Sequence, residues 1–149
     1  MVSGKEIQTA PRLRLTVLES PTYKAKTEFL INACGYIYSL RKARDGCVYI
    51  GTKTTNNETG EPLNDIAFQT GEPGMGNRHL LIKYDLERKG YYMKDMGEGT
   101  GTFIRIEKSL ALQYGYIISY GNSHMYVILQ PDKSMQLRFL DGPRTDESL

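Results

Sequence analysis

The chain has 149 residues, of which 40% are hydrophobic and 24% are charged, and its formal net charge is +2. This composition is typical of one globular domain with a sizeable core and excludes a disordered chain. The charge is too small to indicate nucleic acid or a membrane surface as the partner. The short basic cluster Leu40–Arg44 is predicted to be a solvated loop.

Two cysteines, Cys34 and Cys47, are too few for a disulfide framework. We expect buried free thiols in a reducing compartment, and a disulfide between the two remains the alternative. Residues 1–10 have no apolar core of the kind a secretion signal needs, and every apolar run is too short to cross a bilayer. The sequence therefore predicts an intracellular protein, cytoplasmic or nuclear.

Taken in chain order, the sequence alternates short apolar segments with glycine turns, and no segment shows a sustained helical period. In residues 12–18, Leu13, Leu15 and Val17 share one face, which is the period of a strand. Further strands rich in tyrosine or β-branched residues are predicted over 36–40, 47–50, 79–85, 90–96, 102–107, 115–120, 125–130 and 135–140. The tyrosines suit half-buried sheet surfaces, where the ring packs and the hydroxyl stays in water.

Strands at this spacing predict an all-β fold, with ten or eleven strands in two sheets packed as a β-sandwich. We expect one domain over residues 11–142, a flexible N-terminal tail over 1–10 and a flexible C-terminal tail over 143–149. The longest polar connection, Gly51–Asp65, is of a length that is either functional or disordered.

No constellation in the sequence predicts catalysis or a cofactor. The two histidines, His79 and His124, each open an apolar strand and are expected to be structural hydrogen-bonding groups, so no metal site is predicted. The glycine-rich run Met96–Ile106 lacks the spacing of a nucleotide-binding loop and is better explained as a tight turn. Its backbone N–H groups remain available as an anion-binding surface.

Five segments, in this order, carry a family resemblance. They are "YIGT" (49–52), "NDIAF" (64–68), "MGNRHLLI" (75–82), "DMGEGTGTFIRI" (95–106) and "GYIISYGNSHMYV" (115–127). Together they resemble the forkhead-associated (FHA) domain, and with the flanking strands the likeness covers residues 12–140. The resemblance implies an eleven-stranded β-sandwich that recognises phosphothreonine peptides through loops at one end.

The resemblance assigns some residues to loop architecture and others to ligand binding. His79 is implied to be a buried hydrogen-bonding post that steadies its loop. The architectural positions are Gly51, Asn64, Asp65, His79, Gly101 and Thr102. The candidate ligand-binding positions are Thr52, Lys53, Gly76, Asn77, Arg78 and Thr100.

The ligand-binding positions depart from the family. Thr52 stands where the family has a phosphate-binding arginine, Gly76 where it has a serine, and Thr100 where it has an asparagine. Lys53 and Arg78 are candidate replacements for the lost positive charge, and for both the alternative is a solvated surface charge. The loop after Lys53 offers Thr54, Thr55 and Asn57 as further donors, although for these three and for Lys53 the surface role is favoured.

Two functions follow from these residues. The first is a phosphothreonine-peptide-binding signalling module with a rebuilt pocket around Arg78, Asn77, Lys53 and Thr100. The second is a phosphate-independent interaction or scaffold domain, which an exposed apolar patch around Tyr36, Tyr38, Tyr114 and Tyr116 would favour. In both, the partner is a protein, phosphorylated or unmodified, and the oligomeric state stays open.

Overall fold

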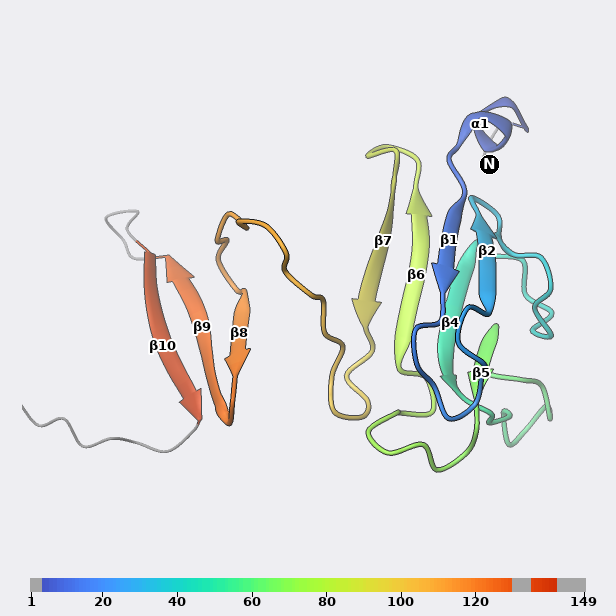
Figure 1. Cartoon of the computed structure of the whole chain (residues 1–149). Helices are drawn as coiled ribbons and strands as arrows, with labels where there is room; N and C mark the ends of the chain where they lie inside the picture. The colour runs from blue at the N-terminus through green and yellow to red at the C-terminus, as the bar shows by residue number, and fades with distance from the viewer. Residues whose placement is uncertain (1–3, 130–134, 142–149) are drawn as a thin grey trace, which may run out of the picture. The chain divides into compact units, whose positions relative to one another are not determined.

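The computed structural model describes residues 4–129 and 135–141, which divide into two compact units, Met1–Phe103 and Ile104–Leu149. The first unit contains α1 (Gly4–Thr9), β1 (Leu13–Thr16), β2 (Glu28–Asn32), β3 (Gly35–Tyr36), β4 (Cys47–Thr52), β5 (Ile66–Phe68), β6 (Leu80–Asp85) and β7 (Gly90–Asp95) (Figure 1). The second contains β8 (Ile117–Tyr120), β9 (Ser123–Leu129) and β10 (Met135–Asp141).

The first unit consists of two sheets that enclose one core. The smaller sheet has the antiparallel order β1-β2-β3, and the larger has the order β5-β4-β6-β7, in which β4 and β5 are parallel. Both sheets contribute to the core, since its buried residues come from β2, β4, β5 and β6. They are Phe29, Ile31, Val48, Ile66 and Ile82.

The predicted alternation of β1 is confirmed. Leu13, Leu15 and Val17 pack against the core, whereas Arg14 and Thr16 are exposed. Because strand side chains alternate between faces, this pattern fixes which face of β1 turns inward.

The second unit is the antiparallel sheet β10-β9-β8, in which Val127 is fully buried. His124 lies in β9 and its Nδ1 is 2.7 Å from Ser119 Oγ of β8, a side-chain hydrogen bond within this sheet. Of the four tyrosines expected to mark an apolar patch, Tyr36 and Tyr38 belong to the first unit, and Tyr114 and Tyr116 belong to the second.

Ten strands in three sheets and one short helix occur in the described residues, which confirms the all-β class. The count of eleven strands in two sheets is not confirmed and stays a prediction. The predicted strand over 102–107 is wrong, because these residues pair with no strand, and the predicted strand over 36–40 is reduced to β3. A period-two pattern specifies a strand only where a partner supplies hydrogen bonds, and the side chains of Ile104 and Ile106 are exposed.

The N-terminal stretch contains α1, which was not predicted because six residues are too few to show a helical period. This helix is the only one in the described ranges and is far shorter than a bilayer crossing requires. The expected C-terminal tail, 143–149, lies outside the described residues.

The long connection Gly51–Asp65 is ordered by its own backbone hydrogen bonds. The N–H of Asn56 donates to Glu61 O at 2.7 Å, and the N–H of Leu63 donates to Thr54 O at 3.1 Å. These hydrogen bonds join the two sides of the connection and so hold its tip in place.

The basic cluster was predicted to be solvated, and this is wrong for Arg41, which is 7% exposed. Its Nε donates to Asp65 Oδ2 at 3.1 Å, and its Nη2 donates to Asp45 Oδ1 at 2.7 Å and to Cys47 O at 2.9 Å. These charge-assisted bonds replace the water that Arg41 loses on burial. The hydrogen bond from Arg41 also lowers the pKa of Asp45 to about 2.

Both cysteines are free thiols, as expected. The expectation that they are buried is wrong, because Cys34 is exposed and Cys47 is half-buried. Cys34 follows β2 in a turn, where the alternation of the strand no longer applies.

We predict that Arg41→Ala destabilises the fold strongly, because it leaves the Asp65 carboxylate, whose side chain is 3% exposed, without its cation. Breaking a buried ion pair in this way costs about 3–5 kcal/mol. The matched control is Arg14→Ala, which breaks an exposed pair with Glu28 at 3.7 Å and should cost less than about 1 kcal/mol. Denaturant unfolding measures both, and equal losses would contradict the role given to Arg41.

Candidate functional site

Loops from four strands meet at one end of the larger sheet of the first unit. Register places the end of β4 beside the end of β5 (Thr52 with Phe68), the start of β6 beside β4 (Leu80 with Ile50), and the end of β7 beside the start of β6 (Asp95 with Leu80). The connections after β4, before β6 and after β7 are therefore neighbours, and they hold every candidate residue that the sequence singled out.

A buried amide joins the first two of these loops. Asn64 is 3% exposed, and its Nδ2 donates to the carbonyl oxygens of Thr52 at 2.8 Å and Asn77 at 2.6 Å. The backbone approaches closely here, because a Cβ added to Gly51 would stand 2.3 Å from the carbonyl oxygen of Asn77. Only glycine fits at position 51, and this contact fixes the 76–79 loop against the end of β4.

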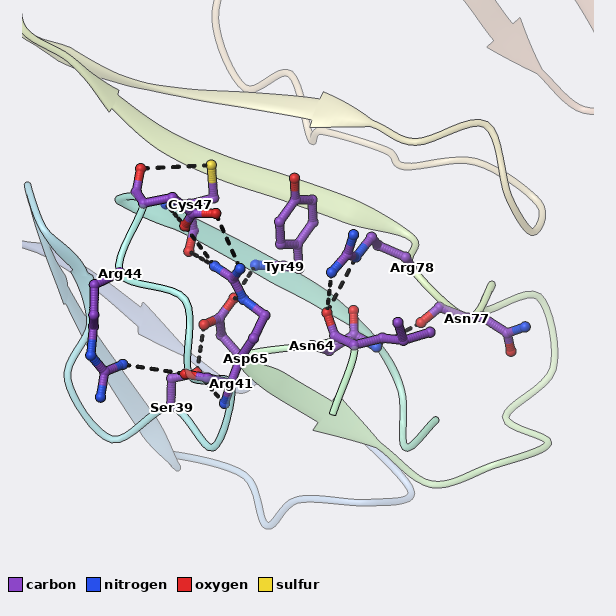
Figure 2. Close-up of polar contacts among 11 residues, drawn as sticks. Ser39, Arg41, Arg44, Cys47, Tyr49, Asn64, Asp65, Asn77 and Arg78 are labelled. Atoms are coloured by element: carbon purple, nitrogen blue, oxygen red, sulfur yellow. Dashed lines mark hydrogen bonds and ion pairs between the residues drawn. The ribbon is translucent and has the colours of Figure 1, made fainter. Parts of the chain in front are cut away.

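Asp65, the neighbour of Asn64, is held as firmly. Its Oδ2 accepts from the N–H of Tyr49 at 2.7 Å as well as from Arg41, and its Oδ1 accepts from Ser39 Oγ at 2.5 Å (Figure 2). Every carboxylate oxygen therefore has a donor, as a buried charge requires.

His79 connects the second loop to the third. Its Nδ1 accepts from the N–H of Gly76 at 3.0 Å, and its Nε2 lies 2.9 Å from Gly101 O. These partners assign the neutral tautomer with the proton on Nε2, since a carbonyl can only accept. The ring is a hydrogen-bonding post between the loops, with neither nitrogen left for a metal or a proton transfer.

The third loop is closed by Asp95. Its Oδ2 accepts from Thr102 Oγ1 at 2.7 Å and its Oδ1 accepts from the N–H of Gly97 at 2.8 Å. Both hydrogen bonds lower the pKa of the Asp95 carboxyl, and the bond from Thr102 has the larger effect. Thr100 is also used internally, because both its N–H and its Oγ1 donate to Gly74 O.

Arg78 turns toward the protein. Its Nη2 and Nε donate to Leu63 O at 2.6 and 3.2 Å, and its guanidinium carbon is 3.7 Å from the centroid of the Tyr49 ring. Figure 2 shows the Arg78 guanidinium beside the Tyr49 ring. A guanidinium committed in this way braces the long connection against β4.

Glu98 is a residue that the sequence reasoning missed. Its Oε2 accepts from the backbone N–H of Arg78 at 2.7 Å, and its Cβ would stand 2.3 Å from a Cβ at Gly76. Because Gly76 has no side chain, there is room beside it for the side chain of Glu98. The sequence offered one signal for Glu98, which is an acidic residue three positions after Asp95 in the glycine-rich run.

Beside these loops lies an open hollow whose lining is mostly polar. The lining residues are Lys53, Thr54, Thr55, Asn56, Asn57, Glu58, Leu63 and Asn77. Lys53 forms no ion pair within the described part of the chain. Asn77 accepts from Thr52 Oγ1 through Oδ1 at 3.2 Å, and no described residue accepts from its Nδ2.

The structure therefore brings two of the six candidate ligand residues, Lys53 and Asn77, to one hollow. The other four contact protein groups: Thr52 is 4% exposed and bonded to Asn77, Gly76 lies against Glu98, and Arg78 and Thr100 are bonded as described above. Within residues 4–129 and 135–141, no three metal-ligating side chains gather as a metal site would need.

We predict that Gly51→Ala destabilises the fold by about 1–3 kcal/mol, because the new Cβ would meet the Asn77 carbonyl at 2.3 Å. The matched control is Gly90→Ala, where the added Cβ lies 4.0 Å from the nearest atom, Arg88 O, and the change should stay within about 0.5 kcal/mol. Thermal or denaturant unfolding compares the two, and an unchanged Gly51→Ala protein would contradict the close approach.

Comparison with known proteins agrees with this loop arrangement. Residues 48–121, which include β4 to β8 and all the loops above, match the FHA domain. No curated protein and no solved structure matches the chain. FHA domains are phosphopeptide-binding interaction modules. Residues 48–121, which hold Gly51, Asn64, Asp65 and His79, therefore belong to the forkhead-associated family.

Proposed function

We propose that this chain is a phosphothreonine-peptide-binding signalling module whose pocket is the hollow beside Lys53 and Asn77. The observation that carries the proposal is the Lys53 side chain, a cation with no ion pair among the described residues, on a polar hollow at the loop end. A phosphothreonine carries about −1.5 to −2 charges at neutral pH and strong acceptor oxygens, so it needs such a donor.

Lys53 takes the part of the arginine that Thr52 replaces in the sequence. Its ammonium is a point charge with three donors on a flexible stem, and the hollow offers the Asn77 Nδ2 and the Thr55 hydroxyl as further polar groups. A charge-assisted hydrogen bond of this kind contributes about 1.5–3 kcal/mol.

Arg78 and Thr100 keep a place in this proposal as positioning residues. Arg78 holds Leu63, which lines the hollow, and Thr100 holds Gly74 at the start of the loop that carries Asn77. We also retain as proposals the eleven-stranded, two-sheet sandwich, a domain over residues 11–142 and an intracellular location.

We predict that Lys53→Ala weakens binding of phosphothreonine peptides by about 10–100-fold, the equivalent of one charge-assisted bond. The assay titrates peptides selected from an oriented phosphothreonine library against the full chain, each also tested unphosphorylated and as phosphoserine. Lys24→Ala is the matched control, because Lys24 is an exposed lysine in the connection between β1 and β2 and does not line the hollow.

Tight, phosphate-dependent binding that survives Lys53→Ala would refute the assignment of Lys53. Peptides that bind equally well with and without phosphate would refute the phosphopeptide function itself.

A second function is favoured by the acidic groups at the same loops. Glu98 lies against the 76–79 loop and Glu58 lines the hollow, so two carboxylates face a region where a phosphate would have to approach. Like charges disfavour a dianionic ligand. This arrangement suits a domain that recruits an unmodified protein partner.

Glu98→Gln separates the two functions, because it removes the charge and keeps the shape and an acceptor for the Arg78 N–H. A phosphopeptide-binding domain should gain affinity for phosphorylated peptides by about 2–5-fold, the size of an exposed charge interaction. Affinity for unphosphorylated peptides should stay the same. An unchanged ratio between the two peptide forms would favour the phosphate-independent function.

A further inference from the structure

The two cysteines of the chain line one small cavity, which shares no lining residue with the hollow of the proposed peptide site. This cavity, of about 150 Å³, is lined by Cys34 and Gly35 from the turn after β2 and by Arg44 and Cys47 at the entry to β4. Cys34 is exposed and Cys47 is half-buried, so reagents in solution can reach the pair.

The backbone segments that carry the two thiols are in contact. A Cβ placed on Gly35 would lie 3.6 Å from Cys47 O, and a Cβ on Gly46 would lie 3.4 Å from Ala33 O. The turns are fixed on both sides, since the N–H of Cys34 donates to Asn32 Oδ1 at 2.8 Å and the N–H of Cys47 donates to Asp45 Oδ1 at 3.0 Å. Adjacent, ordered backbones are what a disulfide needs.

We propose that Cys34 and Cys47 are a redox pair that forms a reversible intramolecular disulfide with a low-molecular-weight disulfide as oxidant. The thiolate of one cysteine attacks oxidised glutathione, which releases one reduced glutathione and leaves a mixed disulfide. The thiolate of the second cysteine then attacks the protein-bound sulfur and releases the other glutathione. Two protein thiols are oxidised, one glutathione disulfide is reduced, and each departing thiolate takes a proton from a protein thiol.

The bond would close a loop around residues 35–46, which include the buried Arg41. Arg41 donates to the carbonyl of Cys47, so the disulfide would tie the turn after β2 to the segment that holds the Arg41 ion pairs. Closing a loop of this length restricts the unfolded chain, and the midpoint of thermal unfolding should rise by about 5 °C or more.

The test incubates the reduced full chain with oxidised glutathione and measures free thiols, intact mass and the linked peptides without reductant. The expected product has lost both thiols, has a mass lower by two hydrogen atoms, and joins the Cys34 and Cys47 peptides. Protein that keeps glutathione on either cysteine, forms a disulfide dimer or does not react would overturn the proposal.

The control variant combines Cys34→Ser with Leu18→Cys, which keeps two thiols but moves one to a position that is 89% exposed. Position 18 follows β1 at the end where Thr16 pairs with Glu28, whereas Cys34 follows the opposite end of β2. This variant should accumulate glutathione adducts.

A second measurement compares the effective concentration of the two thiols in native and in guanidinium-unfolded protein. If the fold holds the pair together, the native value should be higher by roughly tenfold or more. Equal values would show that the bond reflects only closeness in the sequence and would overturn the proposal.

Discussion

The buried carboxylate of Asp65 is the constraint on which the loop end depends. It is placed where β5 begins, and it accepts hydrogen bonds from Arg41, Ser39 and the backbone of Tyr49. A charge buried to this degree is tolerated only when its acceptor sites are occupied, so the 39–41 segment and β4 must both converge on it. Its neighbour Asn64 is thereby positioned to bridge the ends of β4 and the 76–79 loop.

The contacts that hold the loops are separate from the groups that face solvent. Asn64, His79 and Gly51 act through backbone carbonyl and N–H groups, whose geometry does not change with the neighbouring side chains. Lys53 and the residues beyond it project from this frame onto the hollow. Residues that line the hollow can therefore change without loss of the contacts that hold the loops.

The sequence predicted the parts of the structure that depend on local periodicity and on glycine. The alternation of Leu13, Leu15 and Val17 was sufficient for β1, because burial of one face has a period that can be read directly. The burial of Arg41 could not be predicted, since its buried partner Asp65 lies 24 residues further along the chain, just before β5. The prediction of a strand over 102–107 was wrong for a related reason, because a period-two pattern does not show which strand would supply the hydrogen bonds.

Arg78 shows most clearly that the position of a residue in a motif does not determine where its side chain points. The sequence shows only that an arginine precedes His79. Its N–H groups can donate to a carbonyl oxygen, and its planar face can stack on an aromatic ring. Leu63 O and the Tyr49 ring supply both within the fold, so this guanidinium is committed to protein groups.

The positive charge left at the hollow is the ammonium of Lys53, which binds as a point charge and lacks the two parallel donors of a guanidinium. In the proposed function, selection of the phosphorylated residue would come from the fixed groups around Lys53. Asn77 is held at two points, because its Oδ1 accepts from Thr52 in β4 and its carbonyl oxygen accepts from Asn64, which lies before β5. In the proposed pocket, the fixed Asn77 amide would determine where a phosphate binds, and the Lys53 ammonium would supply most of the attraction.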